Sequence, residues 1–321
     1  MMRNLPNISA QIDEDKIFKI INKNFSKLGP HFYMVICNWL VRAYSAFGDI
    51  DKYLILINLV NRQFIFLRKN GLVVEFDNFF ADKPIEIDKI NISDISNELN
   101  LPKESVRRKI YELEKKGIIK REKKKILIYR TSLSSNRVNI AIKEISILLH
   151  EFNKILKNEK EITNIFEIEE IKSSIKKNYS FCWYQFFKFL FSYTKRMRTE
   201  VNDLETLCIG MTVVLNAVQN KEFVATKKDR LSYHKEIMGS DLRGVNAMSI
   251  SDVTGIPRPT VVRKLKWLID KKFLTINDKK LISFDARGSA FNTTVNMQKQ
   301  NMLNLSNFIY RLFNQIKVIN S

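Results

Sequence analysis

The stretch that decides the fold reads ISDVTGIPRPTVVRKLKWLIDKKFLTINDKKLISF and spans residues 250–284. It predicts a short helix over 250–254, a turn at Gly255, and a second helix that opens at Pro257. Proline suits the first turn of a helix, because the N–H that it lacks has no partner there. A hairpin with its tip near residues 277–278 follows. This order of elements is that of a winged helix-turn-helix.

The second helix of this stretch has two distinct faces. Apolar residues at i, i+4 and i+7 form a stripe that faces inward, namely Val261, Leu265 and Leu268. At about 100° per residue, the opposite face carries Pro259, Arg263 and Lys266. A module of this kind places its second helix in the major groove of DNA.

The same pattern occurs once more, 155 positions upstream. Residues 95–128 read ISNELNLPKESVRRKIYELEKKGIIKREKKKILI and align with 250–283 without a gap. Pro102 matches Pro257, and Arg108 matches Arg263. Chance would have to align the turn, the apolar stripe and the basic face together at one offset. A period this long indicates a duplicated domain and not a solenoid.

The length of 321 residues is typical of two domains of ordinary size, each able to bury a core. We predict a mainly α fold with small β-wings. Two tandem winged helix-turn-helix domains, flanked by long helices, are related by a pseudo-two-fold within the chain. The domains span 1–158 and 159–321, with the modules at about 85–130 and 244–285.

Helices are predicted ahead of both modules. In the first half a first helix covers 12–28 and ends at Gly29-Pro30, and two apolar helices follow over 31–47 and 53–67, divided by Gly48-Asp49. The segments 69–88 and 220–243 precede the modules, and their role stays open between an extra hairpin and a ligand-facing loop.

A helix with heptad spacing follows each hairpin. Its apolar positions are Val138, Ile142, Ile145, Leu149, Phe152 and Leu156 in the first half, and Met302, Leu305, Ile309, Leu312, Ile316 and Ile319 in the second. Such spacing forms a narrow seam for packing against another helix. Each seam either closes the core of its own half or forms the interface between the halves.

The positive charge of the chain is concentrated on the modules. The net charge is +20, and it divides equally between the halves. Residues 101–130 hold 12 basic and 4 acidic residues, a local charge of +8, and residues 256–285 hold 8 and 3, or +5. This is the electrostatic footprint of a nucleic-acid binder. A solubilising surface or the lysine bias of an AT-rich genome would explain the lysine content but not its concentration.

The sequence offers little for catalysis. The three histidines are scattered, the three cysteines (Cys37, Cys182, Cys208) have no metal-ligand spacing, and no phosphate-binding glycine loop occurs. The cysteines are interpreted as small buried hydrophobes in preference to a thiol switch. We therefore expect no enzyme activity, no cofactor and no metal. Without a signal peptide or a membrane span, we expect a cytoplasmic protein at the nucleoid.

These features resemble the multiple-antibiotic-resistance regulator (MarR) family. The closest stretch is ISDVTGIPRPTVVRKLKWLIDKKFL, followed after the hairpin by ISFDARGSAF, and in the first half RTSLSSNRV replaces the glycine-containing segment. MarR proteins are usually homodimers of chains about half this length. The resemblance implies a duplicated and fused chain, a monomer that acts as an intrachain pseudo-dimer. A small-molecule effector is an open question.

The predicted recognition helices, 102–116 and 257–271, would enter successive major grooves of double-stranded DNA. Arg108 and Arg263 are the first candidates for base contacts, because arginine reads guanine O6 and N7 through two hydrogen bonds. Lys109 and Lys264 lie toward the core and would reach phosphate. The full set of DNA-contact candidates is Lys103, Glu104, Ser105, Arg107, Arg108, Lys109, Arg121, Lys123, Lys124, Lys125, Arg258, Thr260, Arg263, Lys264, Lys266, Lys279 and Lys280.

A sequence-specific, double-stranded DNA-binding transcriptional regulator is the favoured function. A replication initiator of the plasmid type also carries two winged-helix domains in a basic chain of similar size, and is the first alternative. Iterated repeats beside the gene would favour replication, and a divergent operon would favour regulation. A nonspecific nucleoid protein, the second alternative, would bind without sequence preference.

Overall fold

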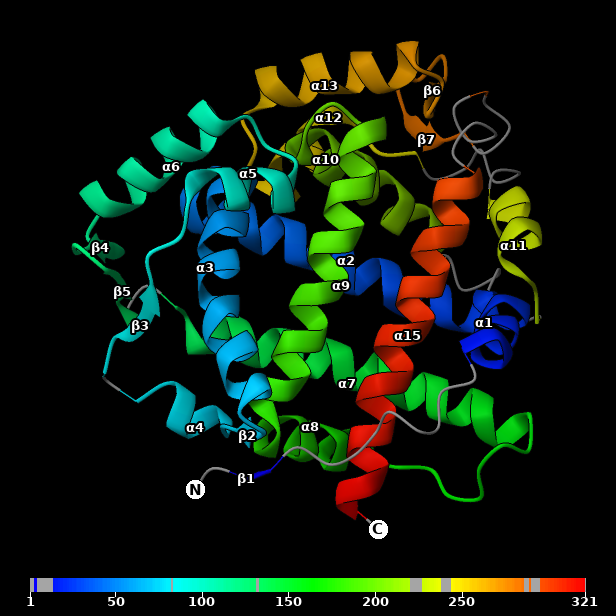
Figure 1. Ribbon diagram of the computed structural model, residues 1–321. Helices are drawn as coiled ribbons and strands as arrows, with labels where there is room; N and C mark the ends of the chain where they lie inside the picture. The colour runs from blue at the N-terminus through cyan, green and yellow to red at the C-terminus, as the bar shows by residue number, and fades with distance from the viewer. Residues whose placement is uncertain are drawn as a thin grey trace.

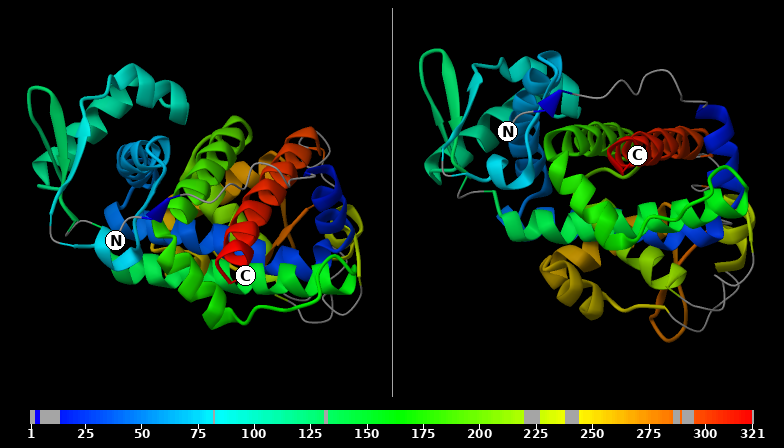
Figure 2. Two further views of the ribbon diagram at one scale, coloured as in Figure 1. Left: turned by 60° about the horizontal axis from the view of Figure 1, so that its bottom comes forward. Right: turned by 90° about the horizontal axis from the view of Figure 1, so that it is seen from below.

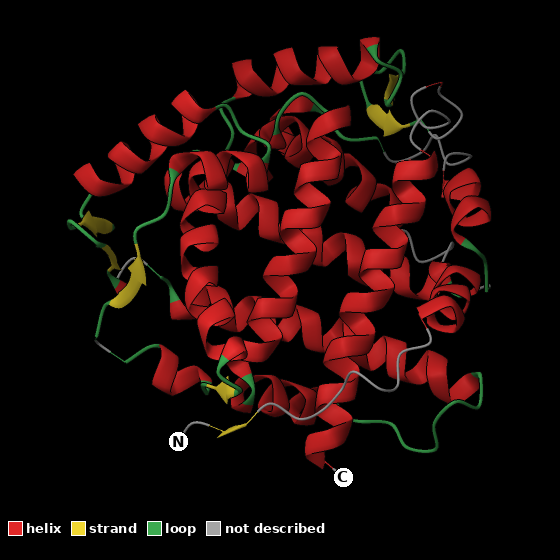
Figure 3. Ribbon diagram, viewed as in Figure 1, coloured by secondary structure: helices red, strands yellow, loops and turns green. Residues whose placement is uncertain are grey.

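The chain is mainly helical, as the sequence predicts, with a few short antiparallel strands (Figure 3). The computed structural model describes residues 3–4, 14–81, 83–130, 133–219, 227–237, 244–285, 289 and 295–320. Long helices fill the centre of the molecule, and the strands lie at its margin (Figure 1).

The first half contains the elements up to residue 158. These are β1 (Arg3–Asn4), α1 (Glu14–Lys23), α2 (Phe25–Phe47), α3 (Ile50–Lys69), β2 (Leu72–Val73), α4 (Phe76–Phe79), β3 (Ile85–Asp88), α5 (Ile92–Leu99), α6 (Lys103–Lys115), β4 (Ile119–Arg121), β5 (Lys125–Ile128) and α7 (Ser135–Asn158).

The second half repeats much of this order. Its elements are α8 (Ile168–Lys177), α9 (Tyr179–Glu200), α10 (Leu204–Val218), α11 (Arg230–Ile237), α12 (Ala247–Thr254), α13 (Arg258–Asp270), β6 (Leu274–Ile276), β7 (Ile282–Phe284) and α15 (Val295–Asn320). Among the described residues no single helix is long and apolar enough to cross a membrane; α9 and α10 pass that test only as a pair bent by 95°.

The predicted helix break at Gly29-Pro30 is wrong. α1 ends at Lys23, and α2 runs from Phe25 through Pro30 without interruption. A proline inside a helix removes one backbone hydrogen bond and usually bends or breaks the helix. Here Phe25 and Leu28, both in the first turn, are fully buried, so packing in the core holds this turn in the helix.

The repeat in the sequence corresponds to a repeat of elements. α5, α6 and the β4–β5 hairpin match α12, α13 and the β6–β7 hairpin. The residue that follows α5 is Asn100 and the one that follows α12 is Gly255, and both have left-handed backbone, with φ of 53° and 70°. Glycine and asparagine tolerate that conformation best, so an asparagine can stand where the other module has its turn glycine.

The gapless alignment holds only as far as the first hairpin strand. Ile119 pairs with Ile128, whereas Leu274 pairs with Phe284, so the offset grows from 155 to 156 across the turn. The second hairpin therefore has one residue more. The first hairpin also pairs with β3, in the strand order β3-β5-β4, while Val245 makes a single bridge to Ile282 in the second module.

One hydrophobic core joins the two halves. α2 packs against α7 and also against α10 of the second half, and α9 packs against α15 and also against α3 of the first half. The buried apolar side chains form one cluster that extends from α1 to α15. The two predicted domains thus share a core, and their boundary at residue 158 stays a prediction.

The heptad seams are buried, and each contacts both halves. The buried members are Ile142, Ile145, Leu149, Phe152 and Leu156 on α7, and Met302, Leu305, Ile309, Leu312 and Ile316 on α15; the Ile319 side chain lies outside the described residues. α7 packs against α2 and α8, and α15 packs against α9 and α1. Each seam therefore closes its own half and also joins the two halves.

The described parts of the segments before the modules contain regular elements. Residues 69–88 form β2, α4 and β3, and Phe76 and Phe79 of α4 pack against the ring of Tyr179 on α9. In the second segment the structure describes 227–237, which includes α11 with its buried Tyr233 and His234. The remainder of 220–243 lies outside the described residues.

Candidate nucleic-acid interface

α6 and α13 are held at the surface by one buried stripe each. Val106, Ile110 and Leu113 on α6 are buried, as are Val261, Leu265 and Leu268 on α13. Both helices lie along the upper edge of the molecule in Figure 1, with their hairpins at the outer ends, and the view from below separates them in depth (Figure 2). The faces opposite the stripes are therefore open at two separate places.

The open face of α6 is charged. Lys103, Glu104, Arg107, Arg108 and Tyr111 are exposed, and Ser105 is half-buried. Arg107 donates to Glu104 at 2.8 Å. The Arg108 side chain is 69% exposed, and its nearest acid is Glu112 at 3.9 Å. Arg108 is thus the arginine on this face that is least engaged with acids.

The open face of α13 carries fewer charges. Arg258, Arg263 and Lys266 are exposed, and no ion pair to them occurs within the described part of the chain. Thr260 is half-buried, like Ser105 at the equivalent position. Between the cations, Val262 is 50% exposed, where α6 has Arg107.

Two of the predicted DNA contacts are engaged inside the protein. Lys109 pairs with Asp49, and the Lys264 ammonium donates to both oxygens of Asp203 at 2.6 and 2.5 Å. Each aspartate also caps a helix, because Asp49 accepts from the Lys52 N–H of α3 and Asp203 accepts from the Thr206 N–H of α10. These lysines therefore hold α6 and α13 against the core, and their ammonium groups do not extend from the open faces.

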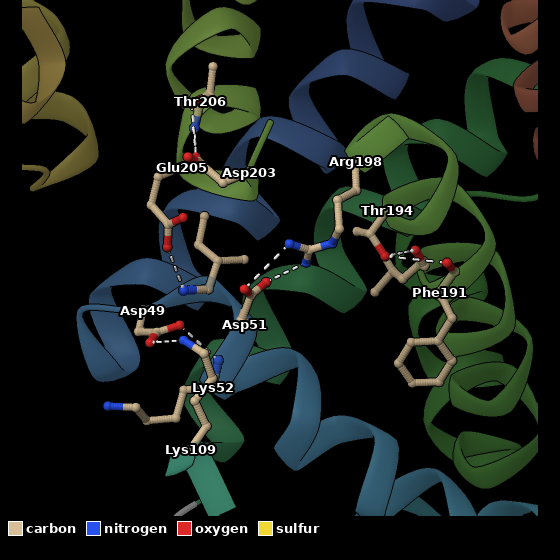
Figure 4. A network of polar contacts seen from close by, with 12 residues as sticks. Asp49, Asp51, Lys52, Lys109, Phe191, Thr194, Arg198, Asp203, Glu205 and Thr206 are labelled. Carbon is tan, nitrogen blue, oxygen red and sulfur yellow. Dashed lines mark hydrogen bonds and ion pairs between the residues drawn. The ribbon is translucent and has the colours of Figure 1, made fainter. Parts of the chain in front are cut away.

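The same place joins the two halves. Figure 4 shows the start of α3, with Asp49 and Asp51, beside the start of α10, with Asp203 and Glu205. Glu205 accepts from the backbone N–H of Ile50 at 3.1 Å, and Arg198 of α9 pairs with Asp51. None of these acids was among the predicted site residues, although residues 203–218 resemble residues 49–64 and both stretches begin with an aspartate.

We expect the Lys264–Asp203 pair to contribute about 2 kcal/mol to stability, between the values typical of exposed and of buried pairs. A double-mutant cycle with Lys264→Met and Asp203→Asn, followed by urea unfolding at pH 7, measures this coupling. A coupling below about 0.5 kcal/mol would contradict the fastening role.

The coupling should also depend on pH. Burial alone would raise the pKa of Asp203, but hydrogen bonds from Lys264 and Thr206 outweigh it and hold the pKa below its usual 3.8. Folding therefore favours the charged carboxylate, so its contribution is complete above that pH. It is lost as pH falls through the lower, folded-state pKa. The cycle repeated at decreasing pH below 3.8 should show the coupling disappear.

The hairpins present further cations. In the first, Lys123 and Lys124 are exposed in the turn and form no ion pair within the described part of the chain. Arg121 is paired with Glu114 at 2.5 Å, and Lys125 with Glu86 at 2.6 Å. In the second, Lys279 and Lys280 are exposed. Lys123, Lys124, Lys279 and Lys280 are therefore the hairpin cations that are most available to a polyanion.

A cavity of about 120 Å³ lies beneath the second module. Its walls include Leu268 of α13, Phe284 of β7 and Tyr33 of α2. Arg230 donates to Gln298 at 2.9 Å in its wall, and the His234 ring nitrogen lies 2.6 Å from the Tyr33 hydroxyl. Burial lowers the pKa of His234 to about 3, so this ring is neutral at neutral pH.

The cysteines are buried in the helical core. Burial raises the pKa of Cys37 to about 11 and raises the pKa of Cys182 and Cys208 as well. A thiol with a raised pKa is a poor nucleophile, which favours the interpretation of these residues as small hydrophobes. Within the described ranges no group of three His, Cys, Asp or Glu is placed to hold a metal ion.

Comparison of the chain with protein-family models, with curated proteins and with solved structures finds no match.

Proposed function

We propose that the chain is a sequence-specific regulator of transcription that binds double-stranded DNA as an intramolecular pseudo-dimer. In this proposal, each half supplies a winged helix-turn-helix of the MarR type, with α6 and α13 in successive major grooves. The protein acts at the nucleoid of the cytoplasm, as a monomer, without catalysis.

The repetition of exposed cations on two equivalent modules supports this proposal most strongly. Arg108 and Arg263 occupy the same position on α6 and α13, and both are exposed. Helix and hairpin cations of this kind supply the phosphate contacts that dominate affinity for DNA, while arginines on the helix supply base contacts. Ser105 and Thr260, both half-buried, provide a hydroxyl at one equivalent position.

Lys109 and Lys264 are not proposed as DNA contacts, because each is paired with an aspartate of the helical core. Arg121 and Lys125 become weaker candidates, since each must exchange an acid partner for phosphate. The plasmid-type replication initiator stays the first alternative. It would bind iterated repeats beside its own gene, so a genomic footprint separates it from a regulator.

One observation favours a small-molecule effector, whose identity stays open. The cavity beneath the second module is lined by Leu268 of α13 on one side and by α2, α9 and α15 on others. A ligand in this cavity would contact both the recognition helix and the core. An apolar ligand with a polar group for Arg230 would suit its lining.

We expect affinity for duplex DNA to fall steeply with salt, because binding releases counterions from the phosphates. The double change Lys123→Ala with Lys124→Ala should lower the slope of log K against log salt by about 2, for all sequences alike. Lys125→Ala should change it less, since Glu86 already neutralises that lysine. Fluorescence anisotropy between low and moderate salt measures the slope.

The matched control removes the same charge from α7. Lys143 and Lys157 are exposed there, and α7 lies at the lower side of the molecule in Figure 1, away from α6 and α13. Lys143→Ala with Lys157→Ala should leave the slope unchanged. Equal effects of the two double variants would mean that the first hairpin makes no specific contact with DNA.

A further inference from the structure

The two modules differ in the polarity of their exposed surface, because the second module exposes apolar side chains where the first has polar or charged ones. Met248, Val253, Val262 and Ile276 are all about half exposed on the second module. At the equivalent positions of the first module stand Ser93, Glu98, Arg107 and Arg121. Large apolar side chains gathered on one surface mark a site of interaction with another molecule.

At one pair of equivalent positions an ion pair in the first module is replaced by two apolar side chains in the second. In the first module Glu114 of α6 pairs with Arg121 of β4 at 2.5 Å. The second module has Ile269 of α13 and Ile276 of β6 at these positions, and both line a groove. The ion pair bridges the helix and the hairpin in the first module, whereas the two isoleucines leave a groove with apolar walls between them in the second.

The groove lies between α13, the start of α12 and the β6–β7 hairpin, and its volume is about 590 Å³. Buried Leu265 and Ile282 form its floor, and Met248, Val262 and Ile276 line its walls. The cations at its rim are Arg258, Lys266 and Lys280, and none of the side chains that line it is acidic. An apolar floor with a basic rim fits an apolar ligand with acidic flanks.

We propose that this groove binds an amphipathic helix of a partner protein, with apolar residues at i, i+3, i+4 and i+7 and with acidic residues beside them. Helices of this pattern lay their apolar face into a groove, and complementary charges at the rim fix orientation. A second copy of this chain is a poor occupant, because its net charge of +20 and its basic modules would repel the rim. The cations at the rim can contact DNA, but the apolar floor and walls favour a protein as the occupant of the groove itself, since protein surfaces that bind DNA are polar and strongly basic.

The proposal that the groove binds a partner helix does not rest on the proposed function, but the expected competition between that partner and DNA does. Arg258 and Lys266 are also proposed DNA contacts, so a helix in the groove would cover them. Partner and DNA would then compete for α13 while α6 stays free to bind.

The test uses the full chain and two synthetic peptides of identical composition. The first peptide has leucines at the helical spacing and glutamates on either side; the second has the same residues in an order without an apolar stripe. We expect the first to bind at least ten-fold more tightly by fluorescence anisotropy at physiological salt. Equal affinities would overturn the proposal, because charge alone would then account for binding.

Two variants locate the site. Val262→Arg with Ile276→Arg introduces the residues of the first module and should reduce the affinity for the striped peptide to that for the scrambled one. Ile140→Arg on α7, an equally exposed apolar position outside both modules, is the matched control and should leave that affinity unchanged. Both altered side chains are half exposed, so the fold should tolerate them, and circular dichroism checks this. If the double variant bound the striped peptide as tightly as the wild type does, the groove would be excluded as the binding site.

A labelled thiol distinguishes the other occupants. The native cysteines are buried, so Val262→Cys can be labelled selectively with an environment-sensitive dye. The striped peptide should shift its emission to the blue. A shift with a random 40-bp duplex but not with the peptide would assign the groove to DNA. Self-association that Val262→Arg abolishes would assign it to a second copy; either result overturns the proposal.

Discussion

Arg108→Ala should remove the base preference in one half of the DNA site, and Arg263→Ala should remove it in the other. Each change should cost about 1–3 kcal/mol if the lost contact is bidentate to guanine. Because the proposed function assigns the two half-sites to separate helices, the double variant should lose roughly the sum of the two single losses. Binding-site selection on the wild type and the three variants measures the preference, and titration of the selected duplex measures the loss.

The selected site should be an imperfect palindrome. The modules share Arg108 and Arg263 but differ at Arg107 and Val262, so the half-sites should agree at one base and diverge beside it. Their centres should lie roughly 10 bp apart or a multiple of it. Lys143→Ala on α7 serves as the control and should select the wild-type site. Identical sites from wild type and both single variants would show that these arginines do not read bases.

Local patterns predicted the local structure well. The stripe Val261, Leu265 and Leu268 depends only on helical geometry, and all three side chains are buried. The heptad seams likewise depend on spacing within one helix, and their described members on α7 and α15 are buried apart from half-buried Val138. Spacing within a helix does not show which other helix the apolar stripe packs against. The sequence therefore could not decide whether each seam closes the core of its own half or forms the interface between the halves.

The predictions that were wrong concern residues whose environment depends on parts of the chain far away in the sequence. Helical spacing places Lys109 and Lys264 toward the core, but the predicted partner was phosphate, and the acids that they meet, Asp49 and Asp203, lie about sixty positions earlier. Pro30 predicts a helix break on local grounds, and burial of Phe25 and Leu28 in the shared core overrides it. A long-range contact has no periodic signal in a single sequence.

The apolar groove is a different case. The exchange of Arg107 for Val262 and of Arg121 for Ile276 is visible in the alignment of the two modules. It could not be interpreted there, because an apolar residue on a short helix or hairpin is more often buried than exposed. The exposure of these residues is what turns a difference in sequence into a candidate binding surface.

The shared core predicts how the chain unfolds. Phe152 of α7 is fully buried and meets the ring of Phe313 on α15, in the other half, with 5.8 Å between ring centroids and a perpendicular arrangement. Phe152→Ala should therefore lower the free energy of unfolding by about 3–5 kcal/mol through lost burial and a cavity. Since both halves contribute to the contact, the whole chain should unfold in one transition at a lower urea concentration.

Urea unfolding followed by both circular dichroism and tryptophan fluorescence provides the measurement, because Trp39 lies in the first half and Trp183 and Trp267 in the second. Coincident curves that move together identify a single cooperative unit. Ile140→Ala on the same helix is the matched control; its side chain is 51% exposed, so the change should stay within about 0.5 kcal/mol. Two resolved transitions, of which Phe152→Ala moves only one, would instead establish two independent domains with the α7–α15 contact as a minor interface between them.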